Sequence, residues 1–350
     1  MPPSAAGISE VLTLVSNVYR APLTVAELKE HPEYPKVVWD LTPIKKGSVP
    51  VAHGRGGPIN IFYEIHGSGP KHLVWIMGLG SFKTSWQRQT KYFGHEHGSK
   101  YSSLILDNRG MGESDKPLMR YSTSEMAKDV VDVLDHIGWT AQRHLHVIGI
   151  SMGGMIAQEL ALLIPIRMAS LSLVSTAAHI VNSVGFVENL RNRINLFIPK
   201  DPDIQLAESK ARLFSKEWLD APDSEGDFPT NGDRFAAQEV RKRGNVEGFT
   251  RKGFMLQAIA AGWHHKSPEQ LKQIGDQIGR ERIQVLHGTI DNMITVPHGD
   301  VLAKGLGWEK SQKSGVRKLI YEGRGHVLIL EEKDEFNRVI AEIVDKTEGI

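Results

Sequence analysis

The feature that most constrains the fold of this chain is the hexapeptide Gly149-Ile150-Ser151-Met152-Gly153-Gly154. The preceding run His144–Ile148 is typical of a short buried strand, and Met155–Leu163 has helical character up to Pro165. A strand that enters a helix through G-x-S-x-G is the nucleophile-elbow pattern, in which a tight turn strains the backbone of the serine. Small glycines allow the helix to leave close to neighbouring strands. The pattern predicts that the Ser151 hydroxyl stands above a sheet, accessible to a base and a substrate.

The composition excludes several classes of protein. With 350 residues, the chain is long enough for one large α/β domain that carries an insertion. The 42 basic and 41 acidic residues leave a net charge of +1, which favours neither nucleic acid nor an anionic membrane surface as a partner. The absence of cysteine excludes disulfide bonds, thiolate metal sites and a cysteine nucleophile. No apolar run reaches the length of about 18 residues that spans a membrane, and no targeting peptide is recognisable, so we expect a cytoplasmic protein.

The pattern of strands and helices divides the chain into segments. Residues 1–47 are expected to be an N-terminal extension, with an amphipathic helix over Ser9–Tyr19 and a short helix around Thr24–Glu30. Strands alternate with helices over residues 48–178 and again over 268–350, which predicts an α/β fold with a mostly parallel, doubly wound sheet. Such a sheet binds ligands at the carboxyl ends of its strands. The expected strands are Val49–His53, Ile59–Ile65, His72–Met77, Ser102–Leu106, His144–Ile148, Ala169–Ser175, Arg282–Leu286 and Val316–Tyr321.

The alternation lapses over residues 179–267, which we interpret as an inserted helical cap. An insertion that begins and ends at the loop edge of a parallel sheet must lie over that edge. Its aromatic residues are expected to form the core of the cap, and some of them are expected to line an apolar pocket. The expected helices of this segment are Val187–Phe197, Ile204–Leu219, Phe235–Arg243 and Arg251–Ala261.

A base and an orienting acid can be assigned from their positions after predicted strands. A serine hydroxyl is a weak nucleophile, so it needs a base, and the base needs a partner that orients it. Asp291 follows the strand Arg282–Leu286, and His326 follows the strand Val316–Tyr321. Both would lie at the carboxyl edge with Ser151, in the chain order that this arrangement uses. We expect His326 to accept the serine proton and Asp291 to fix the tautomer of the imidazole.

The negative charge that develops on an attacked carbonyl oxygen requires two N–H donors. Met152 follows the nucleophile directly and supplies one backbone N–H by geometry. The second is expected from Leu79, in the loop after the strand His72–Met77. Gly78 and Gly80 on either side allow that backbone to bend toward a substrate.

Together these residues resemble the α/β-hydrolase fold superfamily over roughly residues 48 to 344. The resemblance implies a sheet with a helical cap and a Ser-Asp-His triad that works without a cofactor. This chain has Met77-Gly78 where the family often has His-Gly, and serine at position 151 distinguishes it from the epoxide hydrolases and haloalkane dehalogenases. The segments that carry the resemblance are Met77–Gly80, Asp107–Ser114, Gly149–Gly154, His287–Asp291 and Gly325-His326.

The leading functional hypothesis is a cofactor-independent serine hydrolase that cleaves a carboxylic ester or lactone with an apolar portion, through an acyl-enzyme on Ser151. The same triad could hydrolyse a C–C bond of a vinylogous diketone or catalyse perhydrolysis, and the fold also serves as a ligand receptor. These alternatives, and the oligomeric state, stay open at this stage. No metal is expected, because His95-Glu96-His97 and His264-His265 lack the spacing of H-E-x-x-H. Charged substrates are expected to be poor, because no counter-ion is evident near the motifs.

Overall fold

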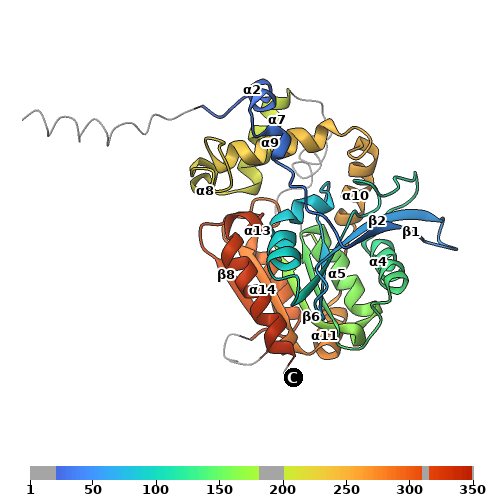
Figure 1. Ribbon diagram of the computed structural model, residues 1–350. Coiled ribbons are helices and arrows are strands. Elements are labelled where there is room, and N and C mark those ends of the chain that lie inside the picture. Colours follow the sequence, from blue (N-terminus) through green and yellow to red (C-terminus); the bar gives the residue numbers. More distant parts are fainter. Residues whose placement is uncertain (1–20, 181–200, 310–314, 349–350) are drawn as a thin grey trace, which may run out of the picture.

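A computed structural model of the protein describes residues 21–180, 201–309 and 315–348. At its centre is an eight-stranded sheet in the order β1-β2-β4-β3-β5-β6-β7-β8 (Figure 1). Strand β2 runs antiparallel to β1 and to β4, and all other neighbours are parallel, which confirms the predicted α/β fold with a mostly parallel sheet. The strands are β1 Lys45–Val51, β2 Ile59–His66, β3 Lys71–Ile76, β4 Tyr101–Leu106, β5 Leu145–Ile150, β6 Met168–Val174, β7 Ile283–Gly288 and β8 Arg317–Tyr321.

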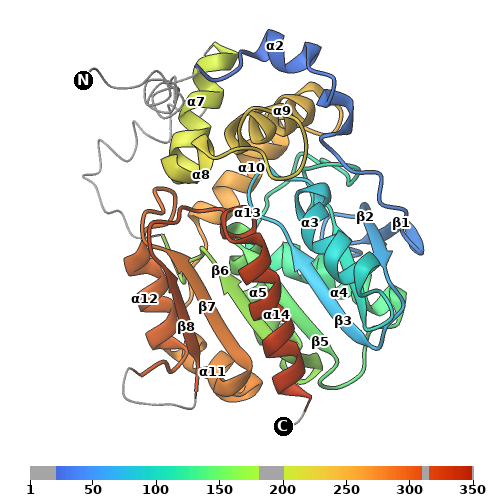
Figure 2. The same cartoon turned by 60° about the vertical axis from the view of Figure 1, so that its left-hand side comes forward.

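Helices cover both faces of the sheet because successive side chains of each strand point to opposite sides. In β3, Val74 and Ile76 join the core under α4 Thr123–Ile137, α5 Met152–Leu163, α11 Pro268–Ile278 and α12 Val296–Gly305. Leu73 and Trp75 join a second core, formed with α13 Leu328–Glu331, α14 Lys333–Thr347 and the helical stretch over residues 83–96 that contains α3 Gln87–Gln89. Figure 2 shows α14 in front of the sheet and α5 behind it. The parallel strands are buried on both faces, which explains why they read as continuous apolar runs.

The structure contains each strand that the sequence predicts, with ends that differ by a few residues. It divides the expected helix Ile204–Leu219 into α7 Pro202–Leu213 and α8 Lys216–Asp220, because Phe214 is extended and the Ser215 side chain caps the second helix. Helix α11 and the helical stretch over residues 83–96 were not anticipated. The expected helices Ser9–Tyr19 and Val187–Phe197 lie outside the described residues. No helix within the described ranges has the length and apolar content needed to cross a bilayer.

Within the described residues, four helices lie over the carboxyl ends of the parallel strands, where the sequence predicts a cap (Figures 1 and 2). They are α7, α8, α9 Asn231–Gly244 and α10 Arg251–Gly262. The chain leaves and re-enters the sheet domain at adjacent points, since the N–H of Lys266 donates to the carbonyl of Ala178 at 2.8 Å and His179 pairs with His265. We therefore retain residues 179–267 as the proposed cap.

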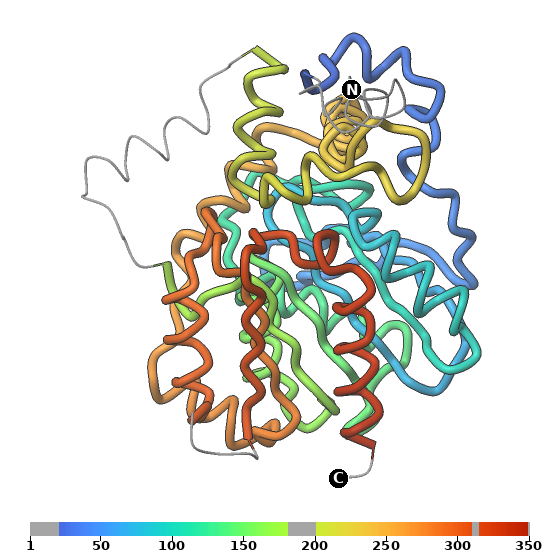
Figure 3. Tube along the Cα trace, turned by 90° about the vertical axis from the view of Figure 1, so that its left-hand side faces the viewer, coloured from blue at the N-terminus to red at the C-terminus, as the bar shows by residue number. Residues whose placement is uncertain are grey.

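Residues 23–38 of the N-terminal extension pack on these cap helices (Figure 3), whereas residues 44–47 at its end pair with β2 and so join the sheet. Helix α2 Val25–Glu30 lies where the sequence predicts a short helix, and the side chain of Thr24 caps its first turn. The backbone N–H groups of Leu23 and Val25 donate to the carboxylates of Asp233 and Asp203, at 3.0 and 2.7 Å. The apolar cluster that joins the two segments contains Leu28, Val37, Leu206, Phe228, Ala236, Ala237 and Val240. The extension thus completes the core of the cap.

His264 lies where the end of the cap meets the sheet domain. Its Nδ1 is 2.9 Å from the Thr123 hydroxyl, and its buried Nε2 has no hydrogen-bond partner among the described residues. Burial lowers the pKa of His264 to about 3, and the positive charge of Lys266 contributes to this shift. The imidazole is therefore neutral in the folded protein at pH values where an unfolded chain, with a histidine pKa of about 6.5, begins to bind the proton.

This difference predicts a loss of stability in acid. Below a pH of about 6.5, His264 binds a proton in the unfolded state but stays neutral in the native state. The free energy of unfolding therefore decreases as the pH falls, by about 2 kcal/mol at pH 5. His264→Asn keeps an acceptor for Thr123 and removes the titration, so its free energy of unfolding should depend less on pH between 7 and 5. Urea denaturation at several pH values measures this difference. The exposed His53, changed to Asn, is the control and should keep the wild-type slope.

Candidate active site

Ser151 occupies the turn between β5 and α5 and has a strained backbone. Its φ of 56° and ψ of −124° lie outside the regions that side-chain-bearing residues normally adopt. The turn also leaves no room beside it. A Cβ on Gly149 would lie 2.3 Å from the carbonyl oxygen of Gly153, and a Cβ on Gly153 would lie 2.1 Å from that of Ile76. Glycine is thus required at both positions, for the reason that the sequence motif suggests.

Neighbouring loops hold the turn in place. The backbone N–H of Ser151 donates to the carbonyl of Val174 at 2.9 Å, and the hydroxyl of Thr176 donates to the carbonyl of Ser151 at 2.7 Å. On the other side, a Cβ on Gly78 would lie 3.1 Å from the Cβ of Ser151, so the β3 loop passes directly beside the serine. The serine side chain is only partly buried and lines a cavity.

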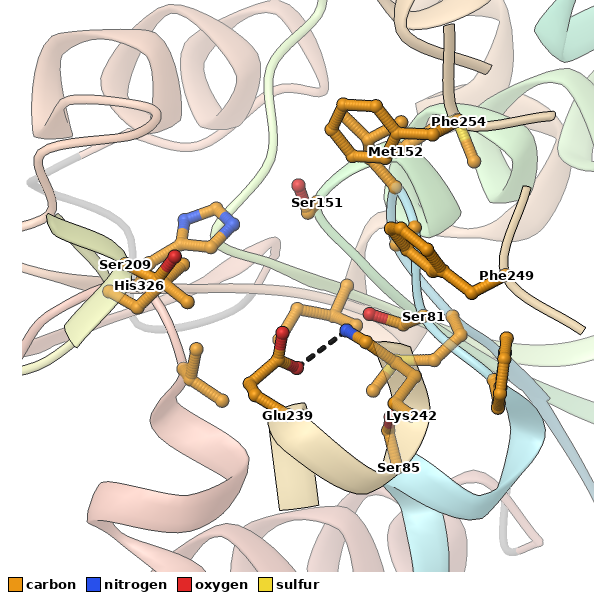
Figure 4. Close-up of a pocket in the computed structure, with 18 of the residues that line it drawn as sticks. Ser81, Ser85, Ser151, Met152, Ser209, Glu239, Lys242, Phe249, Phe254 and His326 are labelled. Atoms are coloured by element: carbon orange, nitrogen blue, oxygen red, sulfur yellow. Dashed lines mark hydrogen bonds and ion pairs between the residues drawn. The ribbon is translucent and has the colours of Figure 1, made fainter. Parts of the chain in front are cut away.

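Asp291 and His326 lie side by side at the carboxyl ends of β7 and β8. His326 Nδ1 is 2.7 Å from Asp291 Oδ2, and both residues are buried. The other carboxylate oxygen of Asp291 accepts the backbone N–H groups of Met293 and Ile294 at 2.8 and 2.9 Å. With Nδ1 engaged, the opposite edge of the imidazole faces the cavity beside Ser151 (Figure 4). The structure therefore brings together the three residues that the sequence singles out.

A second histidine, His287, contacts the same carboxylate, and the sequence analysis assigned it no role. Its Nε2 lies 2.6 Å from the carbonyl of Ile294 and 3.3 Å from Asp291 Oδ2. A carbonyl can only accept, so Nε2 carries the proton and its N–H is shared between the two oxygens. The only sequence signal is its position four residues before Asp291, near the end of β7. The contact itself depends on how the loop folds back.

These contacts determine the ionisation of Asp291. Burial alone would raise the pKa of its carboxyl group. The charge of His326 and hydrogen bonds from His287 and His326 outweigh that effect and hold the pKa well below the usual range of aspartate. Asp291 is therefore a carboxylate across the whole range of pH in which an enzyme of this kind could work.

The loop that carries His326 is anchored to the cap. The backbone N–H of His326 donates to the carbonyl of Leu213, the last residue of α7, at 2.8 Å. Glu331 also links the His326 loop to the cap. Its carboxylate accepts the N–H of Gly325 in the loop at 3.0 Å and the hydroxyl of Ser215 in the cap at 2.8 Å. The position of the imidazole thus depends on the cap as well as on the sheet.

Two backbone N–H groups are available where the sequence predicts an oxyanion site. Leu79 and Met152 both line the cavity, and neither N–H donates a hydrogen bond within the part of the chain that the structure describes. The β3 loop is held by α10, because the N–H of Gly80 donates to the side-chain oxygen of Gln257 at 3.0 Å. Gln257 in turn donates to the carbonyl of Arg109 at 2.9 Å. Free donors on a fixed backbone are what a developing oxyanion requires.

The cavity above these groups has a volume of about 1020 Å³ and two unlike walls. One wall is apolar and includes Phe249 and Phe254 from the cap, beside Met152 (Figure 4). The other carries Glu239 and Lys242 from α9. The apolar wall agrees with the expectation from the sequence. The charged wall does not, because the sequence analysis found no counter-ion near the site.

A strained serine at the carboxyl edge of a parallel sheet, beneath a cap and beside a histidine-aspartate pair, is the arrangement of the α/β-hydrolase class. This chain belongs to that family, because the model of the alpha/beta hydrolase fold matches residues 71–333.

Individual proteins resemble parts of the chain. A protein of Azorhizobium caulinodans named carbamate hydrolase RutD is 30% identical over 171 residues, which are 49% of this chain and 60% of that protein. A 3-oxoadipate enol-lactonase of Acinetobacter baylyi is 34% identical over 108 residues, 31% of this chain and 38% of the lactonase. A thermophilic esterase from Thermogutta terrifontis has a similar structure, with a TM-score of 0.66 and 19% identity over 87% of this chain and 99% of the esterase. At that identity the structural similarity concerns the fold alone.

Proposed function

We propose that the protein is a cofactor-independent serine hydrolase that cleaves a carboxylic ester or lactone with an apolar portion. The observation that carries this proposal is the 2.7 Å contact between His326 and Asp291 beside the cavity that Ser151 lines. Such a pair is what a serine hydroxyl needs to become a nucleophile. The names of the similar proteins, an esterase and an enol-lactonase among them, are consistent with cleavage of a bond between a carbonyl carbon and oxygen.

In this mechanism Ser151 Oγ attacks the carbonyl carbon while His326 Nε2 accepts its proton. Asp291 stabilises the imidazolium that forms and keeps the ring in one tautomer. The N–H groups of Leu79 and Met152 donate to the oxyanion. His326 returns the proton to the alcohol oxygen as that bond breaks, which leaves an acyl group on Ser151. Water then attacks the acyl-enzyme with His326 as base and releases the acid.

The apolar wall predicts how the rate depends on the acyl chain. Each methylene that it buries contributes about 0.8 kcal/mol, so kcat/KM should rise nearly fourfold per carbon until the cavity is filled. A homologous series of 4-nitrophenyl esters, run beside a lactone and a vinylogous diketone, measures this dependence. A preference for acetate over butyrate and hexanoate would contradict the apolar site. Turnover of the diketone far above that of every ester and lactone would favour C–C bond hydrolysis instead.

A second prediction concerns His287 as a positioning residue for Asp291. His287→Leu removes the N–H that Asp291 Oδ2 and the Ile294 carbonyl share, and loss of a hydrogen bond to a charged group should lower kcat by about tenfold to a hundredfold. It should also leave more of the negative charge of Asp291 to act on the imidazolium of His326, and so move the acid limb of the pH profile upward. His287→Gln places an amide N–H near the position of Nε2 and should recover most of the rate.

The comparison of the two His287 variants separates positioning from packing. Both replace a buried ring with a flexible side chain, so a purely structural role would make their rates and pH profiles alike. Equal losses in His287→Leu and His287→Gln, with an unchanged acid limb, would show that His287 does not act through Asp291.

A further inference from the structure

The charged wall of the cavity consists of three side chains on consecutive turns of α9. Lys242 Nζ lies 2.5 Å from Glu239 Oε1, and Arg243 Nε lies 3.4 Å from Glu239 Oε2. The side chains of Glu239 and Lys242 are each 15% exposed. Two cations therefore share one carboxylate at a largely buried position, which leaves an excess of positive charge on this wall.

Helix α7 holds the guanidinium of Arg243 in place through neutral groups. Arg243 Nη1 donates to the side-chain oxygen of Gln205 at 2.9 Å, and Nη2 donates to the hydroxyl of Ser209 at 3.2 Å. Its buried Nε forms the 3.4 Å ion pair with Glu239 but no hydrogen bond among the residues described. Lys242 Nζ, on the other side, lies 5.6 Å from the centre of the Phe249 ring. Apart from Glu239, these neighbours orient the two cations and do not neutralise them.

Three other cations that line the cavity have carboxylate partners of their own, and a fourth, Arg241, donates to the backbone carbonyls of Tyr34 and Pro35. Lys83 lies within 3.6 Å of Glu64, Asp107 and Glu113, and Arg88 forms a bidentate pair with Glu225 at 2.6 and 2.5 Å. Arg212 pairs with Glu208 at 3.1 Å. The wall at α9 differs from these sites, because among the described residues Glu239 is the one carboxylate that pairs with Lys242 and also the one that pairs with Arg243.

The charge excess faces the same cavity as the candidate nucleophile. In Figure 4, Glu239 and Lys242 lie across the open space from Ser151, and all three line the cavity. Burial would raise the pKa of Glu239, but the charges of Lys242 and Arg243 outweigh burial and lower it, so the carboxyl group stays ionised. A substrate held at Ser151 that extends across the cavity would meet a cationic wall at its far end.

We propose that Lys242 and Arg243 bind a carboxylate at the end of the substrate remote from the scissile ester, so that the substrate is an ω-carboxy ester with an apolar middle. This inference rests on the function proposed above and narrows its substrate class. Lysine and arginine bind carboxylates through charge-assisted hydrogen bonds, which are stronger than neutral ones and strengthened further by partial burial. The apolar wall would contact the methylenes between the two ends.

The test compares matched substrates. The 4-nitrophenyl hemiesters of the dicarboxylic acids from succinate to suberate are each paired with the corresponding ω-methyl ester, which has nearly the same shape and no charge. At the best chain length, kcat/KM for the carboxylate should exceed that for its methyl ester by about tenfold. A higher rate for the methyl ester at every length, or for an ω-ammonium ester that pairs with Glu239, would overturn the proposal.

Three variants test which residues are responsible. Lys242→Met should reduce the preference for the carboxylate to about twofold or less, with little change for the methyl esters. Glu239→Gln should increase the preference, because it removes the competing carboxylate. A preference for the carboxylate that falls in Lys242→Met and rises in Glu239→Gln cannot result from general damage to the fold. Lys272→Met changes the net charge equally on α11, outside the cavity, and should leave the preference as in the wild type. An unchanged preference in both Lys242→Met and Glu239→Gln would refute the site.

A binding measurement separates this inference from the catalytic proposal. Calorimetry with Ser151→Ala, which cannot form an acyl-enzyme, compares monomethyl adipate with dimethyl adipate. Tighter binding of the monoester, lost in the double variant with Lys242→Met, would support the carboxylate site even if no ester were turned over. Equal affinity for the two compounds would reject the site, whatever the activity of Ser151.

Discussion

Replacing Ser151 with alanine is expected to lower kcat/KM for any ester substrate by about 10⁴-fold or more, as for triad serines generally. The hydroxyl group is the only part removed, and it lines the cavity rather than packing in the core. The main-chain contacts to Val174 and Thr176 that hold the strained turn do not involve it. The variant should therefore unfold at the same urea concentration as the wild type. Labelling by a fluorophosphonate should disappear together with turnover.

Ser175 offers a matched control for this substitution. It follows β6, the strand next to that of Ser151, has a positive φ of 45°, and carries a buried hydroxyl without a hydrogen-bond partner in the described structure. Ser175→Ala should keep both labelling and turnover. Retention of most activity by Ser151→Ala, or equal losses in the two variants, would show that Ser151 is not the nucleophile.

Asp291→Asn is expected to have the next largest effect, a loss in kcat of about 10⁴-fold with KM nearly unchanged. The carboxylate accepts the Nδ1–H of His326, so Nε2 is free to take the serine proton. An asparagine amide can instead donate to Nδ1, which places the imidazole proton on Nε2 and blocks the base. The N–H groups of Met293 and Ile294 can still bond the remaining carbonyl oxygen, so the loop should keep its shape.

Asp107 is the control acid, because it also follows a strand of the sheet. Its carboxylate accepts the backbone N–H groups of Lys83 and Glu113 at 2.7 and 3.0 Å, and it is fully buried. Asp107→Asn should therefore lower the free energy of unfolding while folded protein retains its turnover. A loss of turnover in Asp107→Asn, with normal rates in Asp291→Asn, would make the assignment of the acid wrong.

The strands along the chain, and the positions of Ser151, Asp291 and His326 after three of them, could be predicted, since both depend on short patterns in the sequence. The order of the strands within the sheet was not predicted. Buried parallel strands are continuous apolar runs, and the loops after them meet at one edge. Boundaries were less predictable. The expected helix Ile204–Leu219 is broken at Phe214, because Ser215 caps a second helix and its hydroxyl also bonds Glu331 from the far end of the chain.

The charged wall of the cavity could not be predicted from the sequence, because it also depends on contacts between distant segments. Glu239, Lys242 and Arg243 read in the sequence as an ordinary solvated helix face, since charges spaced three and four apart are common on exposed helices. Only the packing of α9 across the sheet edge turns that face toward the cavity. His287 is similar, because its contact with Asp291 arises from a loop that folds back over the end of β7.

The sequence by itself determined the turn at Ser151, because its sterics are local: Gly149 and Gly153 are the residues that such a turn can accommodate. It also determined the order in which Asp291 and His326 follow their strands. The tertiary structure alone decided that His287 supports Asp291, that the N-terminal extension completes the cap, and that α9 presents its cations to the cavity. Those outcomes depend on contacts between residues far apart in the chain, whose free energies follow from packing and burial and leave no short pattern in the sequence.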